Sequence, residues 1–286
     1  MAEIKNILVT GASGQLGRSI KDISNGYIYK FIFKSRDELN ITDLTALISF
    51  FDKNEIFVVI NCAAYTDVIE AEINKKEAKI VNSESPDKLA FLCKKKDIRL
   101  IHISTDYVFD GQKTEPYNEA DITNPLNYYG LTKLEGEKNI LKHQLRNSII
   151  IRTSWLYSKY ENNFVKSILK KIKSNDEIYV TSNEYGSPTN AIDLAKAILD
   201  LIPQIINSNT EIYHFANVGV CSRLEFAKYI NEITGCRAVI KSSEKSNLKL
   251  IRPRFSALNS KKITKKFNLK IDLWKTSLKK YLANEI

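Results

Sequence analysis

A tyrosine and a lysine four residues apart are the residues in this sequence best suited to carry out chemistry. Tyr129 and Lys133 lie in the segment YYGLTK, at the start of a helical pattern over about 127–144. Residues four apart project from the same face of a helix, so the phenol and the ammonium are expected side by side. An ammonium favours the phenolate, and the spacing therefore predicts that Lys133 lowers the pKa of Tyr129 below about 10. A tyrosine tuned in this way can give a proton to a carbonyl oxygen.

Thr105 supplies a hydroxyl that can bind the same carbonyl oxygen. It follows the apolar run Arg99–Ser104, and open α/β sheets bind ligands at the carboxyl ends of their strands. A lone YxxxK pair is weak evidence, because it can also be an exposed aromatic–cation pair on a helix surface. Tyr128 is expected to present its ring to the neighbouring helix face. The threonine, tyrosine and lysine, in this order after a glycine-rich turn, favour catalysis.

The glycine-rich segment TGASGQLG predicts a site for a dinucleotide. It follows the apolar run Lys5–Val9 and precedes a helical pattern over about 15–23. In such a turn Gly11 permits the tight bend, Gly14 lets a pyrophosphate approach the backbone, and Gly17 allows close packing of helix on strand. The helix N-terminus adds free N–H groups and partial positive charge for the phosphates.

Two basic residues near the end of the second predicted strand bear on which dinucleotide binds. Lys34 and Arg36 follow the run Tyr27–Phe33. A carboxylate at this place would bind the ribose 2′-hydroxyl of NADH, whereas arginine accommodates the 2′-phosphate of NADPH. The sequence therefore favours NADPH. Asp37 and Glu38 follow directly, so NADH stays an alternative.

Alternating apolar and amphipathic segments predict the elements that position these groups. The apolar runs of the first half are continuous, which is typical of parallel strands buried on both faces. We therefore predict an α/β fold: a Rossmann-like, doubly wound parallel sheet with a smaller mixed α/β C-terminal substrate lobe. Residues 1–155 form the dinucleotide-binding domain, with later segments returning to it, and 156–286 form mainly the lobe. Strands are expected at 5–9, 27–33, 56–61, 99–104, 148–152, 177–181, 211–217 and 237–241, and helices at about 15–23, 43–53, 77–96, 127–144, 162–174, 190–206 and 222–235.

Composition narrows the class of protein. The 286 residues carry a formal charge of +10, with 43 Lys and Arg against 33 Asp and Glu, but the basic residues are dispersed, so no nucleic-acid partner is expected. Four cysteines without CxxC spacing and three scattered histidines predict reduced thiols and no metal site. The N-terminal residues do not resemble a signal peptide, and the absence of a long apolar run predicts no membrane span. A cytoplasmic location is expected.

Several further segments, read in order, resemble a known family. The motifs match those of the extended short-chain dehydrogenase/reductase superfamily and, within it, closely resemble the dTDP-4-dehydrorhamnose reductase family. The resemblance covers nearly the whole chain and implies NAD(P)H-dependent reduction of a nucleotide-linked 4-keto-sugar. The segments that carry it are GQLG at 14–17, NCAAYTDV at 61–68, STDYVFDG at 104–111, NPLNYYG at 124–130, RTSWLY at 152–157 and YGSPT at 185–189.

The resemblance also implies roles for individual residues. Tyr129 would be the general acid, Lys133 would also hold the nicotinamide ribose, and Thr105 would orient the keto oxygen. Asp106 and Trp155 would contact the sugar. The family usually has aspartate where this chain has an asparagine at position 40. The implied cofactor contacts are Gly14, Gln15 and Leu16 at the pyrophosphate, Ala63, Ala64, Tyr65 and Thr66 along the cofactor path, and Asn40 and Ile41 at the adenine.

Other functions stay open at this level. The basic lobe, with Arg252, could complement a nucleotide diphosphate, but the sequence does not fix the sugar or the nucleotide. Epimerases and dehydratases share the superfamily, although Tyr107 after Asp106 argues against a dehydratase. The regulatory subunit of methionine adenosyltransferase, which acts by binding a partner, resembles the same family. The sequence does not specify the oligomeric state, and a homodimer stays an alternative.

Overall fold

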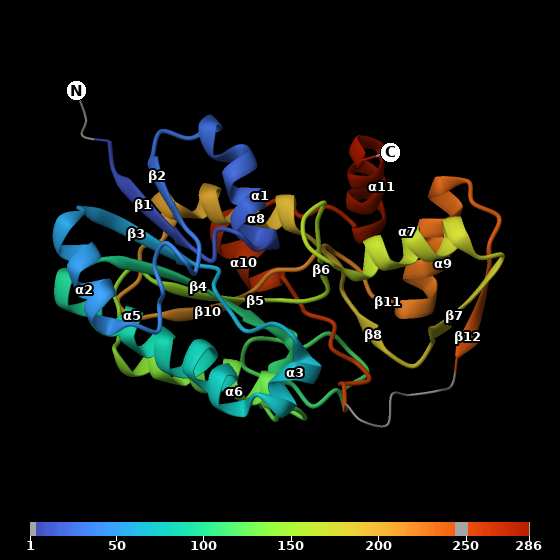
Figure 1. Ribbon diagram of the computed structural model, residues 1–286, viewed down its shortest axis with the longest axis horizontal. Coiled ribbons are helices and arrows are strands. Elements are labelled where there is room, and N and C mark those ends of the chain that lie inside the picture. The colour runs from blue at the N-terminus through green and yellow to red at the C-terminus, as the bar shows by residue number, and fades with distance from the viewer. Residues whose placement is uncertain (1–3, 244–250, 286) are drawn as a thin grey trace.

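The computed structural model describes residues 4–243 and 251–285. They form a six-stranded sheet with helices on both faces, and a smaller lobe lies beside it (Figure 1). The strand order is β10-β5-β4-β3-β1-β2, and each neighbouring pair runs parallel. The predicted Rossmann-like fold is confirmed. The strands are β1 (Asn6–Thr10), β2 (Lys30–Lys34), β3 (Ile56–Asn61), β4 (Arg99–Thr105), β5 (Ile149–Thr153) and β10 (Glu211–His214).

The continuous apolar runs arise because both faces of the sheet are covered. Along β1, Ile7 and Val9 enter one core while Leu8 enters the other. Successive side chains point to opposite faces of a strand, so no polar alternation remains. Helices α1 (Gln15–Ile23), α8 (Ala191–Leu201) and α10 (Lys261–Phe267) cover the first face, and α2 (Leu44–Lys53), α5 (Ser85–Lys96) and α6 (Tyr128–Lys142) cover the second.

The smaller lobe has its own aromatic core and only short strand pairs. Phe226 lies at its centre, stacked on Phe164 at 5.5 Å and edge-on to Trp274 at 5.6 Å between ring centroids. The helices are α7 (Phe164–Ser174), α9 (Arg223–Thr234) and α11 (Trp274–Glu285). The strand pairs are β7 (Glu177–Thr181) with β12 (Val239–Ser243), β8 (Tyr185–Gly186) with β11 (Cys221–Ser222), and β6 (Leu156–Tyr157) with β9 (Thr189–Asn190).

The structure differs from the predicted elements in several places. Strand β2 begins at Lys30, because a 3₁₀ turn ends at Gly26 and the Tyr27 hydroxyl donates to Asp200 at 2.8 Å. The predicted helix 77–96 is three segments: α4 (Lys75–Lys79), a π-helical turn (Ile80–Glu84) and α5. Helices α3 (Val68–Ile73), α10 and α11 were not predicted. The strand at β10 ends at His214 and joins the main sheet beside β5.

A helix that spans a membrane must be both long and apolar. No helix within residues 4–243 and 251–285 meets both requirements.

Candidate active site

The carboxyl ends of β1, β3 and β4 open onto a cleft of about 1140 Å³, with the smaller lobe as its opposite wall. Strands β1 and β3 are neighbours in the sheet. From β1 the chain continues to β2 on one side of this pair, and from β3 it continues to β4 on the other side. Ligands of doubly wound sheets bind at this kind of reversal. Most predicted residues line the cleft: Gly11, Gly14, Gln15, Leu16, Arg36, Asn40, Ile41, Ala63, Ala64, Tyr65, Thr66, Thr105, Asp106, Tyr129, Lys133, Trp155 and Arg252.

The three glycines of the turn have different surroundings. Gly11 has φ +66°, and a Cβ there would lie 2.5 Å from the Ala63 nitrogen at the end of β3. A Cβ on Gly17 would lie 2.5 Å from the Gly11 carbonyl oxygen, so Gly17, which is not part of the cleft lining, packs α1 against the turn. A Cβ on Gly14 would meet only that oxygen, at 3.5 Å. The space beside Gly14 is therefore left open toward the cleft, which fits the approach of a pyrophosphate.

At the adenosine end of the predicted path, Arg36 is the cation that the fold places in the cleft. Its Nη2 lies 3.0 Å from Glu77 Oε1, and both side chains are exposed. Lys34 lies outside the lining, with its ammonium 5.7 Å from the Phe50 ring centroid. The Asn40 amide oxygen accepts two hydrogen bonds from the residue two positions on, at 3.0 and 2.9 Å.

Asn82, a buried asparagine that was not predicted as a site residue, positions the backbone of Tyr65 in the middle of the predicted cofactor path. Asn82, 1% exposed in the π-helical turn, accepts from the Tyr65 backbone N–H at 2.8 Å and donates to the Tyr65 carbonyl at 3.0 Å. It also donates to Thr132 of α6 at 3.2 Å. A Cβ on Gly136 would lie 2.1 Å from the Asn82 carbonyl oxygen, so the two segments touch. The sequence does carry a signal for Asn82, because an asparagine side chain inside a helical pattern competes for backbone hydrogen bonds and is unfavourable there without another role.

Tyr129 and Thr105 are brought together as predicted, but the electrostatics differ. Asn127 caps α6 by accepting from the Gly130 N–H at 2.9 Å, which sets the first turn of the helix. Burial raises the pKa of Tyr129, and a hydrogen bond with Thr105 only partly opposes this. The direction is opposite to the one predicted from the spacing to Lys133. The Lys133 ammonium instead donates to the Ile103 carbonyl at 2.6 Å. Tyr129 therefore keeps its proton at neutral pH.

Lys133 occupies a buried electrostatic environment. Its side chain is 2% exposed, and burial lowers its pKa to about 8, while Glu137 and Cys62 act in the opposite direction. Glu137 forms a buried ion pair with Arg152 at 2.6 Å and accepts from Ser104 at 2.5 Å. Burial raises the pKa of the Cys62 thiol to about 12, so this cysteine is a packing residue and not a nucleophile.

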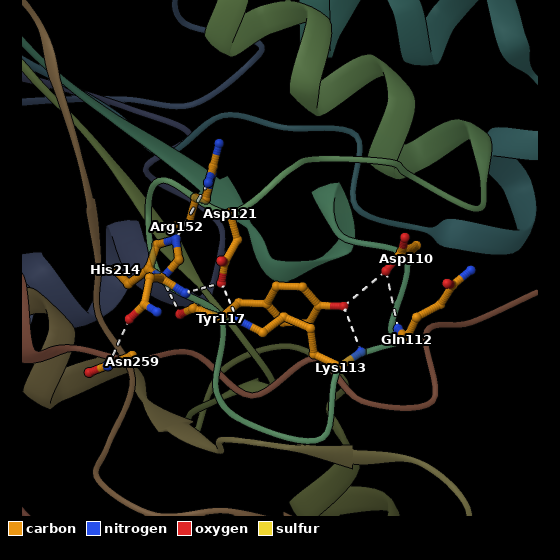
Figure 2. A network of polar contacts seen from close by, with 9 residues as sticks. Asp110, Gln112, Lys113, Tyr117, Asp121, Arg152, His214 and Asn259 are labelled. Atoms are coloured by element: carbon orange, nitrogen blue, oxygen red, sulfur yellow. Dashed lines mark hydrogen bonds and ion pairs between the residues drawn. The ribbon is translucent and has the colours of Figure 1, made fainter.

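Behind the site, a polar network supports the loop that follows β4. Figure 2 shows the Tyr117 ring lying between Asp110 and His214. The Tyr117 hydroxyl donates to Asp110 at 2.9 Å, and the backbone carbonyl oxygen of Tyr117 lies 3.0 Å from His214 Nδ1. Arg152 approaches the other ring nitrogen of His214 at 3.4 Å. Burial and Arg152 lower the pKa of His214 to about 3, so the imidazole is neutral and acts as a structural link.

The part of the cleft between the carboxyl end of β4 and the lobe is lined by charged and aromatic side chains. Asp106 is 2% exposed; burial raises its pKa to about 6, and its Oδ2 has no partner in the described part of the chain. Trp155 has φ +46°, and a Cβ on Gly186 would lie 2.4 Å from its indole. Arg252 Nη1 lies 3.9 Å from Glu184.

Arg223 is a second lining residue that sequence reasoning missed. Its guanidinium carbon lies 3.5 Å from the Trp155 ring centroid. Arg223 is the first residue of α9, where the helix dipole disfavours a cation. A cation at this unfavourable position is the sequence signal from which a functional role of Arg223 could have been predicted.

The described residues contain no group of three or more His, Cys, Asp or Glu arranged to hold a metal ion.

Comparisons of the sequence and of the structure with known proteins lead to the same group of proteins. A family model described as the RmlD substrate binding domain matches residues 5–286. The chain is 35% identical to the dTDP-4-dehydrorhamnose reductase of Aggregatibacter actinomycetemcomitans, over 97% of this chain and 98% of that protein. The crystal structure of a dTDP-4-dehydrorhamnose reductase from Clostridium acetobutylicum has a TM-score of 0.91 at 36% identity, covering 98% and 99% of the two chains. One from Bacillus anthracis in complex with NADP has a TM-score of 0.92 at 31% identity, covering 99% and 100%.

Proposed function

We propose that this chain, which belongs to the dTDP-4-dehydrorhamnose reductase family, reduces the 4-keto group of dTDP-4-dehydro-L-rhamnose to give dTDP-L-rhamnose. The chain is an NAD(P)H-dependent oxidoreductase of the short-chain dehydrogenase type. The observation that carries the proposal is the meeting of Thr105, Tyr129 and Lys133 in the lining of one cleft. The glycine turn lies on one side of this cleft and the smaller lobe on the other.

The sheet side of the cleft fits NADPH. The backbone N–H groups of Gln15 and Leu16 at the start of α1 would receive the pyrophosphate in the open space beside Gly14, and Arg36 would receive the 2′-phosphate. When bound, NADPH supplies the hydride that forms the new C–H bond at the sugar C4. Ala63 and Ala64 leave room at the end of β3. The Gln15 side-chain oxygen accepts from Ser158 and Asn163 at 2.9 and 3.1 Å, which ties the turn to the lobe.

Tyr129 would supply the proton. As the carbonyl π-electrons move onto O4, the phenol transfers its proton to that oxygen, and the hydroxyl of the product forms. The raised pKa keeps the phenol protonated before the reaction. Thr105 would donate to the same oxygen and fix its position, and the positive charge of Lys133 would stabilise the phenolate that remains. Solvent then returns the proton to Tyr129.

The lobe side would bind the sugar and its nucleotide. The unpartnered Oδ2 of Asp106 is a buried acceptor at the cleft, and a sugar hydroxyl would satisfy it. Trp155 would pack on the sugar ring. Arg252 would face the diphosphate.

The direct test is NADPH consumption with enzymatically prepared dTDP-4-dehydro-L-rhamnose, in wild type and Tyr129→Phe. We expect turnover in wild type and a loss of about 10²–10⁴-fold in kcat for Tyr129→Phe, the usual range for a general acid. NADPH affinity should be retained in the variant. Undiminished turnover in Tyr129→Phe would remove the assigned proton donor. NADPH binding without turnover in wild type would favour another keto-sugar or the regulatory-subunit alternative.

A further inference from the structure

Arg223 occupies a position that is costly for an arginine. Its side chain is 11% exposed, and its Nε reaches Glu184 only at 3.7 Å. Burial lowers the pKa of the guanidinium, and the first turn of α9 adds the positive end of a helix dipole. An arginine stays charged in a protein under these conditions. Part of its charge is therefore left without a close partner, and Arg223 lines the cleft.

The guanidinium is nevertheless held in a defined place. Its central carbon lies 3.5 Å from the Trp155 ring centroid and 4.8 Å from that of Phe164. Stacking on aromatic faces fixes the plane of a guanidinium while leaving its N–H groups free to donate at the edge. The group is thus preorganised for a ligand with several acceptor oxygens.

The charges around Arg223 indicate the sign of that ligand. Arg223 and Arg252 both pair with the same carboxylate, Glu184, at 3.7 and 3.9 Å. Two guanidinium groups therefore share one carboxylate at the wall of the cleft, and Asp106 is the second acid whose charge reaches Arg223. Both distances are longer than those of well-formed charge-assisted hydrogen bonds. An anion entering the cleft would compete with Glu184 for both arginines.

The position along the cleft indicates which anion. The positive charge of Arg223 acts on Asp106 and Tyr107, the two residues that directly follow Thr105. The Tyr107 ring lies 5.7 Å from that of Tyr129, edge-on. Arg223 is therefore on the sugar side of the substrate site and not at a remote nucleobase.

We propose that Arg223, held against the Trp155 and Phe164 rings, binds the sugar-linked phosphate of a nucleoside diphosphate sugar and that Glu184 occupies both arginines until this phosphate arrives. The inference rests on the proposed function, because it takes a nucleotide-linked sugar as the substrate. It assigns to Arg223 a binding role, and to Glu184 a role in tuning affinity.

The test compares a nucleoside diphosphate with its monophosphate. Calorimetric titrations with dTDP and with dTMP, each at saturating NADP⁺, isolate the contribution of the second phosphate. For Arg223→Gln we expect dTDP affinity to fall about tenfold or more, the ratio that corresponds to about 1.4 kcal/mol. The dTMP affinity should change by no more than about twofold, well below the contribution of one charged hydrogen bond. Arg223→Lys keeps the positive charge but loses the planar, paired N–H donors of the guanidinium. Its dTDP affinity should lie between those of wild type and Arg223→Gln.

Two further variants sharpen the result. Glu184→Gln should change dTDP affinity in the opposite direction and tighten it, because the arginines lose their competing carboxylate. Lys228→Gln removes an exposed positive charge from the same helix and should leave dTDP affinity unchanged. Equal weakening of dTMP and dTDP by Arg223→Gln would overturn the proposal, since it would mean that Arg223 only supports Trp155. An effect of Lys228→Gln as large as that of Arg223→Gln would also overturn it.

Failure of the proposed function can be separated from failure of this inference. Wild type is titrated in parallel with dTDP, UDP and GDP. Tight binding of UDP or GDP instead of dTDP would correct the nucleotide, and the Arg223 comparison is then made with that diphosphate and its monophosphate. Binding of none of the three by wild type would overturn the inference itself.

Discussion

The two walls of the cleft are built in different ways. Along the predicted cofactor path the sheet wall presents mainly backbone: the turn at Gly11, the small residues after β3 and the N-terminus of α1. The lobe wall presents charged and aromatic side chains, among them Arg223 and Trp155, which meet although they are 68 positions apart in number. The sheet wall is therefore specified by local backbone geometry, and the lobe wall by tertiary contacts.

This difference bears on how each wall tolerates substitution. Backbone geometry at Gly11 leaves no room for any side chain, so a change there should weaken cofactor binding strongly. A charged side chain on the lobe wall can be replaced without closing the cleft, so changes there should shift affinity, selectivity or pH dependence in a graded way. The following substitutions test this contrast, from the largest expected effect to the smallest.

Gly11→Ala should have the largest effect. A Cβ at φ +66° and 2.5 Å from the Ala63 nitrogen combines left-handed strain with overpacking, at a cost of about 3 kcal/mol or more in the free energy of unfolding. NADPH affinity should fall by about 100-fold, equivalent to about 2.8 kcal/mol. Gly26→Ala is the matched control, because a Cβ there meets nothing within 4 Å. For each variant, denaturant unfolding measures the stability and fluorescence titration measures the NADPH affinity. Normal NADPH binding by Gly11→Ala would contradict the claim that backbone geometry specifies the cofactor site.

Asn82→Ala should have an intermediate effect on the same wall. It leaves the Tyr65 backbone groups without their amide partner, which costs about 1–3 kcal/mol in the free energy of unfolding. NADPH affinity should fall about tenfold, or about 1.4 kcal/mol, while the KM for the sugar nucleotide changes little.

Asn139→Ala provides the comparison for Asn82. Asn139 donates from α6 to Ser83 of the same π-helical turn at 3.2 Å but does not reach Tyr65. A loss of NADPH affinity as large in Asn139→Ala as in Asn82→Ala would show general destabilisation of the turn and not positioning of the cofactor path.

Asp106→Asn, in the turn that follows β4 and faces the lobe wall, should have the smallest effect on stability, and this effect should be a gain and not a loss. The folded-state pKa of Asp106 is raised to about 6, so the folded protein binds a proton that the unfolded chain has already released. Ionised Asp106 therefore destabilises the fold above pH 6, and stability from this group increases as pH falls toward the ordinary carboxyl pKa. We expect Asp106→Asn to stabilise the protein by about 1–2 kcal/mol at pH 7.5. Denaturant unfolding at pH 7.5 and pH 4 checks this; a gain independent of pH would contradict it.

The same contrast explains which parts of the fold could be predicted. The strands of the sheet were predicted closely because burial on both faces leaves continuous apolar runs, as in β3 and β4. The start of β2 was wrong because Tyr27 is apolar in pattern but uses its hydroxyl to reach Asp200. Helix α3 was missed because its six residues are too few to show a periodicity.

Candidate site residues follow the same division. The glycine turn and the first turn of α6 are local in sequence, so their members could be recognised by spacing. Asn82, Glu184 and Arg223 reach the site only through the fold, and no local spacing connects them. The pKa of Tyr129 was predicted in the wrong direction because helix spacing places Lys133 nearby but does not reveal burial or the Ile103 carbonyl that takes its ammonium.

The central claim is hydride transfer to the sugar C4 with a proton supplied through the protein. The most direct measurement uses NADPH carrying deuterium at both C4 positions, with dTDP-4-dehydro-L-rhamnose in ordinary water, and locates the label in the product by NMR. We predict one deuterium, at C4 of the sugar, and an unlabelled 4-hydroxyl in exchange with solvent. A product without deuterium, or with deuterium at another carbon, would contradict this account.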